Sequence, residues 1–386
     1  MSLYHIVFAL LLFGVAIEYL QRRTPKLLFA LSFAVLTAML CLRFAQGTDY
    51  VAYRMIFYTM PTDLPGVLSY AHAKAEIGWR ILNMFFRMAN LPFEVFVILL
   101  SLLQMWMLWR FLQRYCQYKM LALFIGYHTL YLTYLFSAMR QGMVIMVFLG
   151  LLLPWLMEGK WLRYLLVTAM LVTIHSVAVI LLVPLVVLYI RISVKHIVAL
   201  VAVGFCVGVL LSVFNVGELV AAYTSTSESY AGETDISVVA LAERVATYVL
   251  VTYMYYLYCD GLEPDVKDPF YQLFKIYSFG ILLYGVLMWS PLISSRTIFA
   301  LKALELPLIA TCITKCRKGS MIALLYLVLL CSVLYVKNIG SSITQSEYIN
   351  ANVVNYPYYT IWDKEEAVAG REDTSRYYEW LTKEKK

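Results

Sequence analysis

Charged residues are scarce in this chain. Only 14% of its 386 residues are Asp, Glu, Lys or Arg, whereas 62% are hydrophobic. The mean hydropathy is +0.73, and soluble proteins carry about a quarter of charged residues, so the composition excludes a water-soluble fold. No polar stretch between the apolar runs of residues 3–337 could hold a soluble domain of roughly a hundred residues. We therefore predict an all-α membrane domain over 1–337 and a polar tail over 338–386.

Three other features are missing. The first apolar run, Leu3 to Leu20, has no basic residue before it and no small-residue cleavage site after it, so we expect a retained span. The seven cysteines fall in apolar runs or at cytoplasmic ends, which is unlike a disulfide framework. Cys312 and Cys316 have no second ligand pair nearby, and no acidic metal-binding motif is present. We expect neither a metal nor a cofactor.

Basic residues cluster in short loops between the apolar runs. This distribution follows the positive-inside rule, so the net charge of +7 reflects cytoplasmic loops and not nucleic-acid binding. Residues 161–190 could form one long helix or two short helices that turn near His175. Two membrane crossings keep every later basic cluster in the cytoplasm, so we predict two. This gives about twelve spans, with the N-terminus and the tail both outside. The clusters are Arg22, Arg23 and Lys26; Arg110, Arg114 and Lys119; Lys160 and Arg163; Arg191 and Lys195; Lys267 and Lys275; and Lys315, Arg317 and Lys318.

Two outer loops are longer than a turn. They cover residues 43–76 and 215–237, and the second contains a run of Ser and Thr typical of a flexible flap. Residues 76–90 alternate apolar and polar side chains at helical spacing, which predicts an interfacial helix on the outer leaflet.

Several polar residues remain at the outer ends of the predicted spans, against the positive-inside pattern. Ionisable groups at membrane depth are costly and usually face a water-filled cavity or each other. Each arginine alone could extend to the interface or pair with a carboxylate. Several arginines in one cavity would instead suit a pyrophosphate, because guanidinium binds phosphate through paired hydrogen bonds. These residues are Arg43, Asp49, Glu76, Arg140, Gln141, His175, Arg244 and Arg296.

Transfer of a sugar onto a hydroxyl benefits from a general base. The candidates on this face are His175, Asp49 and Glu76. Each has a structural alternative: His175 could bond to a backbone carbonyl, and Asp49 could cap a helix that begins near Tyr50. The residues alone leave the choice open.

At these positions the sequence resembles the EpsG-like branch of the bacterial Wzy polysaccharide polymerases. Four short segments carry the resemblance, and together they span most of the chain. They are Arg43 followed by Gly47, Asp49, Tyr50 and Tyr53; Glu76 through Gly78 to Leu82 and Asn83; Arg140, Gln141 and Gly142 with His175 and Ser176; and Ser294, Ser295 and Arg296, with a weaker match at Tyr356 to Tyr359.

The resemblance implies a metal-independent, inverting glycosyltransferase with a GT-C-like membrane fold. Such a polymerase passes a growing glycan from undecaprenyl diphosphate to the non-reducing end of a new lipid-linked repeat unit, at the periplasmic face of the inner membrane. The implied partners are this lipid-linked oligosaccharide, membrane lipid and a chain-length regulator.

From the outer polar residues and the resemblance together we predict roles for individual residues. Arg140 and Arg296 would bind the diphosphate, and Arg43 would bind the second lipid or the oligosaccharide. His175 or Asp49 would activate the acceptor, and Glu76 would position an arginine. Tyr53, Gln141 and Arg244 complete the expected substrate-binding set.

Three alternatives remain open from the sequence. An O-antigen ligase would use the same chemistry, but its usual long periplasmic loop is not evident. A flippase or transporter of the lipid-linked unit often has two repeated halves, and no internal repeat is found here. A membrane acyltransferase would place Asn or Asp beside a deep histidine, and His175 has neither in adjacent sequence. The product could be an O-antigen of lipopolysaccharide, a capsule or an exopolysaccharide.

Overall fold

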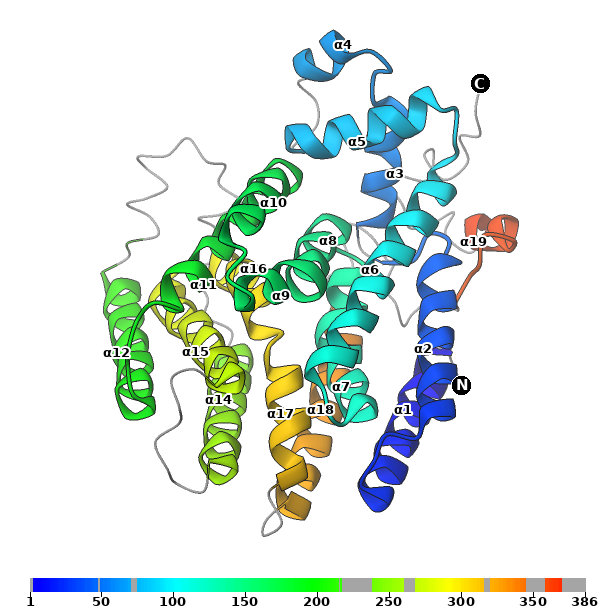
Figure 1. Ribbon diagram of the computed structural model, residues 1–386. Helices are drawn as coiled ribbons and strands as arrows, with labels where there is room; N and C mark the ends of the chain where they lie inside the picture. The colour runs from blue at the N-terminus through cyan, green and yellow to red at the C-terminus, as the bar shows by residue number, and fades with distance from the viewer. Residues whose placement is uncertain are drawn as a thin grey trace. The chain divides into compact units, whose positions relative to one another are not determined.

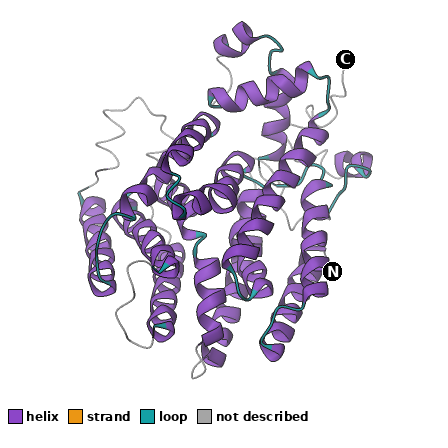
Figure 2. Cartoon of the chain, in the orientation of Figure 1, coloured by secondary structure: helices purple, strands orange, loops and turns teal. Residues whose placement is uncertain are grey.

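The protein is helical throughout the part of the chain that the structure describes. This computed structural model describes residues 3–47, 49–70, 75–214, 216, 238–259, 268–315, 320–344 and 358–369. Within these ranges there is no β-strand (Figure 2). An isolated antiparallel bridge pairs Arg43 with Thr360. The prediction of an all-α protein is confirmed.

The chain folds into two compact units (Figure 1). Unit 1 comprises Met1–Leu151, Ala169–Ser176 and Tyr326–Lys386, and unit 2 comprises Leu152–Thr168 and Val177–Leu325. The helices wholly or mainly in unit 1 are α1 (Leu3–Gln21), α2 (Lys26–Cys41), α3 (Tyr50–Thr59), α4 (Leu64–Ser69), α5 (Ile77–Met88), α6 (Phe93–Tyr115), α7 (Lys119–Gly126), α8 (Met139–Val147), α18 (Ser320–Thr344) and α19 (Lys364–Ala369).

Unit 2 holds the remaining helices, and α10 runs from it into unit 1. These are α9 (Leu153–Met157), α10 (Trp161–Ile174), α11 (Leu182–Val187), α12 (Val194–Val213), α14 (Val238–Tyr258), α15 (Pro269–Leu287), α16 (Pro291–Lys302) and α17 (Glu305–Lys315).

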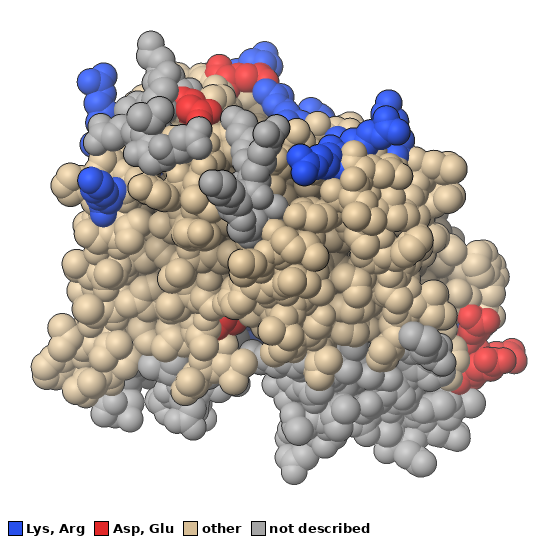
Figure 3. Space-filling view, turned by 90° about the horizontal axis from the view of Figure 1, so that it is seen from below, with Lys and Arg blue, Asp and Glu red and all other residues tan. Residues whose placement is uncertain are grey.

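Several helices suit a membrane-embedded protein. Among the described residues, six helical stretches are long and apolar enough to cross a membrane, and a bent pair formed by α16 and α17 could be a seventh. Four further apolar helices, at 26–41, 161–174, 176–187 and 321–336, are shorter than a usual span. The face in Figure 3 is mostly uncharged, and its Lys and Arg side chains gather mainly along one edge. The full-length stretches are Leu3–Gln21, Phe93–Tyr115, Met139–Met157, Val194–Val213, Val238–Tyr258 and Pro269–Leu287.

Some apolar runs are interrupted. Helix α10 ends at Ile174 and a 3-10 helix begins at Ser176, so the predicted break near His175 is confirmed. The run that contains α16 and α17 bends by 43° at a short break. Two π-helical segments, Tyr127–Leu135 and Phe148–Leu152, adjoin α7 and α8. The breaks at His175 and between α16 and α17 leave helices shorter than a usual span, so fewer stretches qualify as spans than the apolar runs suggested.

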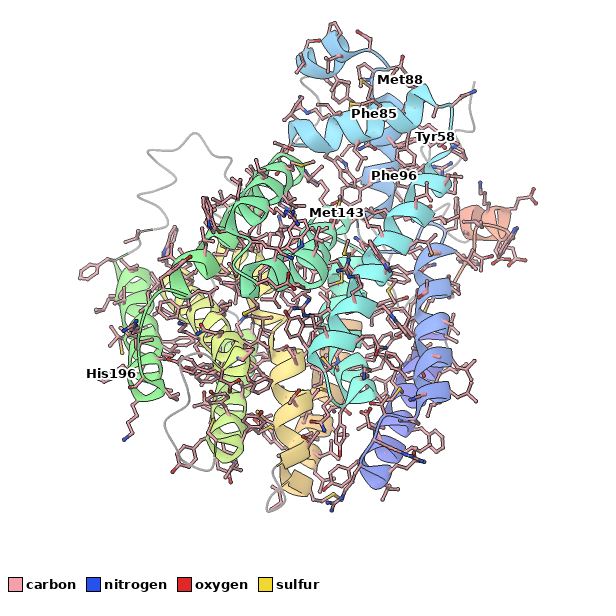
Figure 4. All side chains as sticks on the ribbon, viewed as in Figure 1. Tyr58, Phe85, Met88, Phe96, Met143 and His196 are labelled. Atoms are coloured by element: carbon pink, nitrogen blue, oxygen red, sulfur yellow. The ribbon has the colours of Figure 1, made fainter. Side chains whose placement is uncertain are left out.

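The expected outer loop at 43–76 contains two helices, α3 and α4, so it is more ordered than an extended loop. The helix predicted within 76–90 is present as α5. Its inner face joins a buried aromatic cluster with α3 and α6 that includes Trp79 and Phe96, whereas Phe85 and Met88 are each 59% exposed (Figure 4). The second expected loop, 215–237, lies outside the described residues except for residue 216.

Six cysteines lie within the described ranges, and none of them forms a disulfide bond there. They are Cys41, Cys116, Cys206, Cys259, Cys312 and Cys331.

Candidate functional site

The loop before α3 is fixed by a glycine. Gly47 has φ +94, a conformation that side chains disfavour, and a Cβ there would meet the Phe136 carbonyl oxygen at 2.4 Å. The loop therefore packs directly against the chain that leads into α8. Helix α3 begins at Tyr50, as predicted, and Asp49 precedes it without making a capping hydrogen bond. This placement brings Asp49 and Tyr53 close to Arg140 of α8, with which both interact electrostatically.

A second glycine brings α5 and α10 together. A Cβ on Gly78 would lie 2.2 Å from the Thr173 hydroxyl oxygen and 2.8 Å from its carbonyl oxygen. Only glycine allows this approach, because real Cβ contacts are never that short. The first turn of α5 therefore touches the last turn of α10. Consequently Glu76, which precedes α5, reaches the break that follows α10.

Glu76 is the centre of the site. Its Oε1 accepts hydrogen bonds from the Ser176 amide at 2.9 Å and the Ser176 hydroxyl at 3.1 Å, and it lies 3.4 Å from Nδ1 of His175. Its Oε2 pairs with Nη1 of Arg140. The side chains are partly exposed, at 24% for Glu76, 18% for Arg140 and 16% for His175. One carboxylate thus joins two of the predicted site residues in a partly open position.

The pKa of Glu76 shows how firmly this carboxylate is held as an anion. Burial raises the pKa, but hydrogen bonds from His175 and the Ser176 amide and the charge of Arg140 outweigh it, and the pKa falls to about 2. Glu76 is therefore ionised at neutral pH. A group with so low a pKa is a poor general base at neutral pH. In the structure Glu76 contacts both Arg140 and His175.

Arg140 also contacts an aromatic ring. Its guanidinium carbon lies 5.8 Å from the centroid of the Tyr53 ring, within cation–π range. Tyr53 is buried, and burial together with the negative charge of Asp49 raises its pKa despite the opposing effect of Arg140. The Tyr53 ring also packs on Trp79 of α5, whose ring centroid is 5.5 Å away. Tyr53 therefore links α5 to the arginine.

This arrangement can bind an anion and move a proton. The guanidinium of Arg140 is held by Glu76 and Tyr53, so it is oriented before any ligand arrives. With Nδ1 of His175 turned toward Glu76, the ring's other nitrogen, Nε2, is the atom through which it would accept a proton. The described residues bring together no group of three or more His, Cys, Asp or Glu side chains that could hold a metal ion.

Two further predicted site residues in unit 1, besides Tyr53, are buried. Arg43 is 1% exposed, and its Nη1 donates to the Leu40 carbonyl and to the Ser101 hydroxyl at 3.2 Å. Its guanidinium also lies 5.1 Å from the Phe136 ring centroid. Gln141 of α8 is 4% exposed. The structure thus packs Arg43 into the protein interior, next to the segment that leads to Arg140.

The two predicted residues in unit 2 differ from each other. Arg296 is exposed on α16. Arg244 belongs to a buried network in which it pairs with Glu243 at 3.3 Å and stacks on Tyr284 at 4.5 Å. Lys302 completes the network by pairing with Glu243 at 3.0 Å and with Glu305 at 2.9 Å. Arg244 is therefore neutralised by a protein carboxylate.

Sequence reasoning missed most of this network. Glu243, Lys302 and Glu305 lie within apolar runs and were not considered, although opposite charges three residues apart in such a run are a detectable signal. In the sequence, Ser176 stands out only as part of the family-like pattern, and no contact was predicted for it. The contact of Ser176 with Glu76 depends on a fold that brings together residues 100 positions apart.

Comparison with known proteins identifies a family. The model described as the EpsG family matches residues 26–358 of the chain. No curated protein and no solved structure matches the chain significantly. The matched range includes every residue of the Glu76 cluster.

Proposed function

Because the family model covers residues 26–358, this chain belongs to the EpsG family, and we propose that it is a polysaccharide polymerase. Membership of this family suggests a Wzy-like polymerase or a related membrane glycan enzyme. In the proposed reaction, a growing glycan leaves undecaprenyl diphosphate and is transferred to the non-reducing end of a new lipid-linked repeat unit. The proposed product is an O-antigen, a capsular polysaccharide or an exopolysaccharide.

The observation that carries this proposal is the Glu76 cluster. Arg140 suits an anionic leaving group, and His175 suits a proton transfer, and both contact the same carboxylate. Residues on three separate segments converge there within the range matched by the family. Orientation of a cation and a base by a shared carboxylate is what a transfer between a diphosphate and a hydroxyl requires.

The proposed chemistry balances as a single displacement. The acceptor hydroxyl oxygen forms a bond to the anomeric carbon from the face opposite the diphosphate, and the bond from that carbon to the diphosphate oxygen breaks. The diphosphate leaves with the electron pair, stabilised by Arg140. The acceptor proton passes to His175 or to Asp49. Attack from the opposite face inverts the anomeric configuration.

The other residues have proposed roles in the same reaction. Tyr53 and Gln141 support Arg140 from α3 and α8, and Arg296 contributes to binding of a lipid diphosphate. Arg43, being buried, acts on the oligosaccharide or second lipid by holding its loop. Arg244 affects substrate binding through the network that neutralises it. Arginine side chains can take over the charge neutralisation that a divalent metal supplies elsewhere, so the proposed mechanism is metal-independent.

The proposal includes the setting of the enzyme. We propose that the shorter apolar helices also cross the bacterial inner membrane, which gives about twelve spans in a GT-C-like arrangement. The Glu76 cluster then faces the periplasm. A chain-length regulator is the proposed protein partner.

Polymerisation by the purified protein tests this function. Protein in detergent receives its undecaprenyl-diphosphate-linked repeat unit without nucleotide, and the products are resolved on a gel. We expect a ladder from the wild type, no ladder from Arg140→Ala or His175→Ala, and a normal ladder from Arg163→Ala, which removes an exposed arginine of unit 2. Absence of a ladder, with intact units crossing a liposome bilayer instead, would overturn polymerase in favour of flippase.

A further inference from the structure

The C-terminal segment pairs with the loop that leads to the site. Residues Tyr358–Ala369, here called the C-terminal strap, lie beside the end of α2 (Figure 1). The Phe44 amide donates to the Tyr359 carbonyl at 3.0 Å, and the Ile361 amide donates to the Leu42 carbonyl at 2.9 Å. These two bonds flank the bridge between Arg43 and Thr360. The strap therefore adds a short extended pairing to an otherwise helical unit.

The strap has a defined fold of its own. Asp363 Oδ2 accepts hydrogen bonds from the Thr360 amide at 2.8 Å and from the Thr360 hydroxyl at 2.6 Å. These bonds lower the pKa of Asp363. Helix α19 starts at the next residue, Lys364. The turn and the helix thus present fixed side chains to unit 1.

Side chains fasten the strap at three points. The Tyr358 hydroxyl donates to the Met39 carbonyl at 2.8 Å, between residues 319 positions apart. Lys364 pairs with Glu94 of α6 at 3.2 Å. Ala367 is fully buried in the aromatic cluster that also contains Phe44.

Phe44 of the loop contacts both the strap and α3. The cations of Arg54 and Lys364 each lie 5.6 Å from the centroid of its ring, and both pair with the same oxygen of Glu94. Arg54 is on α3, one residue after Tyr53. The strap thus contacts the start of the loop through backbone hydrogen bonds. It is linked to α3 through Glu94, which pairs with both Lys364 and Arg54.

We infer that the C-terminal strap is a positioning element for the proposed reaction. Tyr358 and Lys364 anchor the strap at Met39, Glu94 and Phe44. The backbone bonds of the strap to Leu42 and Phe44 then hold the start of the loop, so that Asp49 and Tyr53 stay beside Arg140. This inference rests on the proposed function for its catalytic consequence, but the docking of the strap is independent of any activity. Neither residue touches the cluster around Glu76 in the described contacts, so both are positioning residues and not catalytic ones.

Hydrogen exchange on the full-length protein tests the docking. Wild type is compared with Lys364→Glu and Tyr358→Phe, and Glu366→Gln serves as a control because it changes an exposed charge on the same helix. We expect amides around Phe44 to exchange about tenfold faster in the two strap variants, and at the wild-type rate in the control. Unchanged exchange in both strap variants would show that the strap does not hold the loop.

Steady-state polymerisation then separates positioning from general stability. In Lys364→Glu and Tyr358→Phe we expect kcat to fall about tenfold, with KM changing less, because acceptor activation depends on the placed loop. Lys364→Arg, which keeps the cation, should restore kcat. If exchange rises but kcat stays at the wild-type value, the positioning role is wrong. If the wild type itself makes no polymer, the proposed function fails while the exchange result still decides the docking.

Discussion

The carboxylate of Glu76 forms an ion pair with the guanidinium of Arg140, which lies 64 residues later in the chain. The other oxygen of that carboxylate is bound by Ser176, 100 residues after Glu76. A single side chain therefore holds together the start of α5, the start of α8 and the break after α10. Removing this carboxylate should therefore disturb the structure at all three of these places.

A double-mutant cycle tests whether Glu76 and Arg140 act as one unit. Glu76→Gln should lower the polymerisation rate by about tenfold or more because Arg140 loses its orienting partner. The double variant Glu76→Gln/Arg140→Gln should be little worse than Arg140→Gln alone, since groups in one network are not additive. If the rate reductions of the two single variants multiplied in the double variant, Glu76 and Arg140 would act independently.

The pH dependence of stability follows from the low pKa of Glu76. Its pKa of about 2 lies below the ordinary 4.5, so the stabilisation that it contributes is complete above pH 4.5 and is lost as the pH falls toward 2. The difference in melting temperature between wild type and Glu76→Gln should be constant from pH 8 to pH 5 and should shrink below that. A difference that begins to shrink near pH 6 would contradict the low pKa.

The contact at Gly78 predicts a large effect from a small substitution. Gly78→Ala should push α5 away from α10 and reduce activity as much as Glu76→Gln does, because the Cβ would meet both the hydroxyl and the carbonyl of Thr173. Adding Thr173→Ala should relieve only part of the loss, since the backbone carbonyl remains. Steady-state rates measure this, and wild-type activity in Gly78→Ala would refute the contact.

Glu18 supports the fold from inside unit 1. It is 1% exposed, and its carboxylate accepts the amides of Met120 at 3.1 Å and Leu121 at 2.8 Å in the first turn of α7. Glu18→Ala would leave these buried donors without an acceptor, which should cost about 3 kcal/mol of stability. Thermal unfolding in detergent measures the loss. Glu18→Gln, which retains one acceptor oxygen, should lose less than Glu18→Ala.

The buried charges of unit 2 predict a compensating pair. Lys302→Met alone leaves Glu305 and Glu243 close together with less positive charge, which should destabilise the protein by about 3–5 kcal/mol. Lys302→Met/Glu305→Met leaves the pair of Arg244 and Glu243 intact and should recover most of that stability. Thermal unfolding of the single and double variants distinguishes the cases. If the double variant were less stable than Lys302→Met, the Glu305 side chain would stabilise the bend between α16 and α17 through contacts other than its pairing with Lys302.

Local patterns predicted the helical elements well. Apolar runs indicated the long helices, and the spacing of Ile77, Ile81 and Phe85 indicated α5. The break near His175 was also foreseen. The number of regular spans was less predictable, because the 43° bend depends on packing and not on apolar composition.

The site was predictable only in part. Outer polar residues drew attention to Glu76, Arg140 and His175, but their mutual contacts depend on the close approach at Gly78. The burial of Arg43 could not be read from its position at the end of an apolar run, because it depends on Ser101 and Phe136. The docking of the strap could not be predicted, since its hydrogen bonds to α2 and to the loop after α2 join residues more than 300 positions apart.

The location of the lipid diphosphate is the most direct test of the central claim that the Glu76 cluster is the reaction site. An experimental structure of the purified protein with bound undecaprenyl diphosphate would reveal it. We predict that diphosphate oxygens lie within hydrogen-bonding distance of Arg140, on the side where His175 and Asp49 can reach an acceptor. A diphosphate bound only by basic residues of unit 2, with none of it near Arg140, would contradict this assignment.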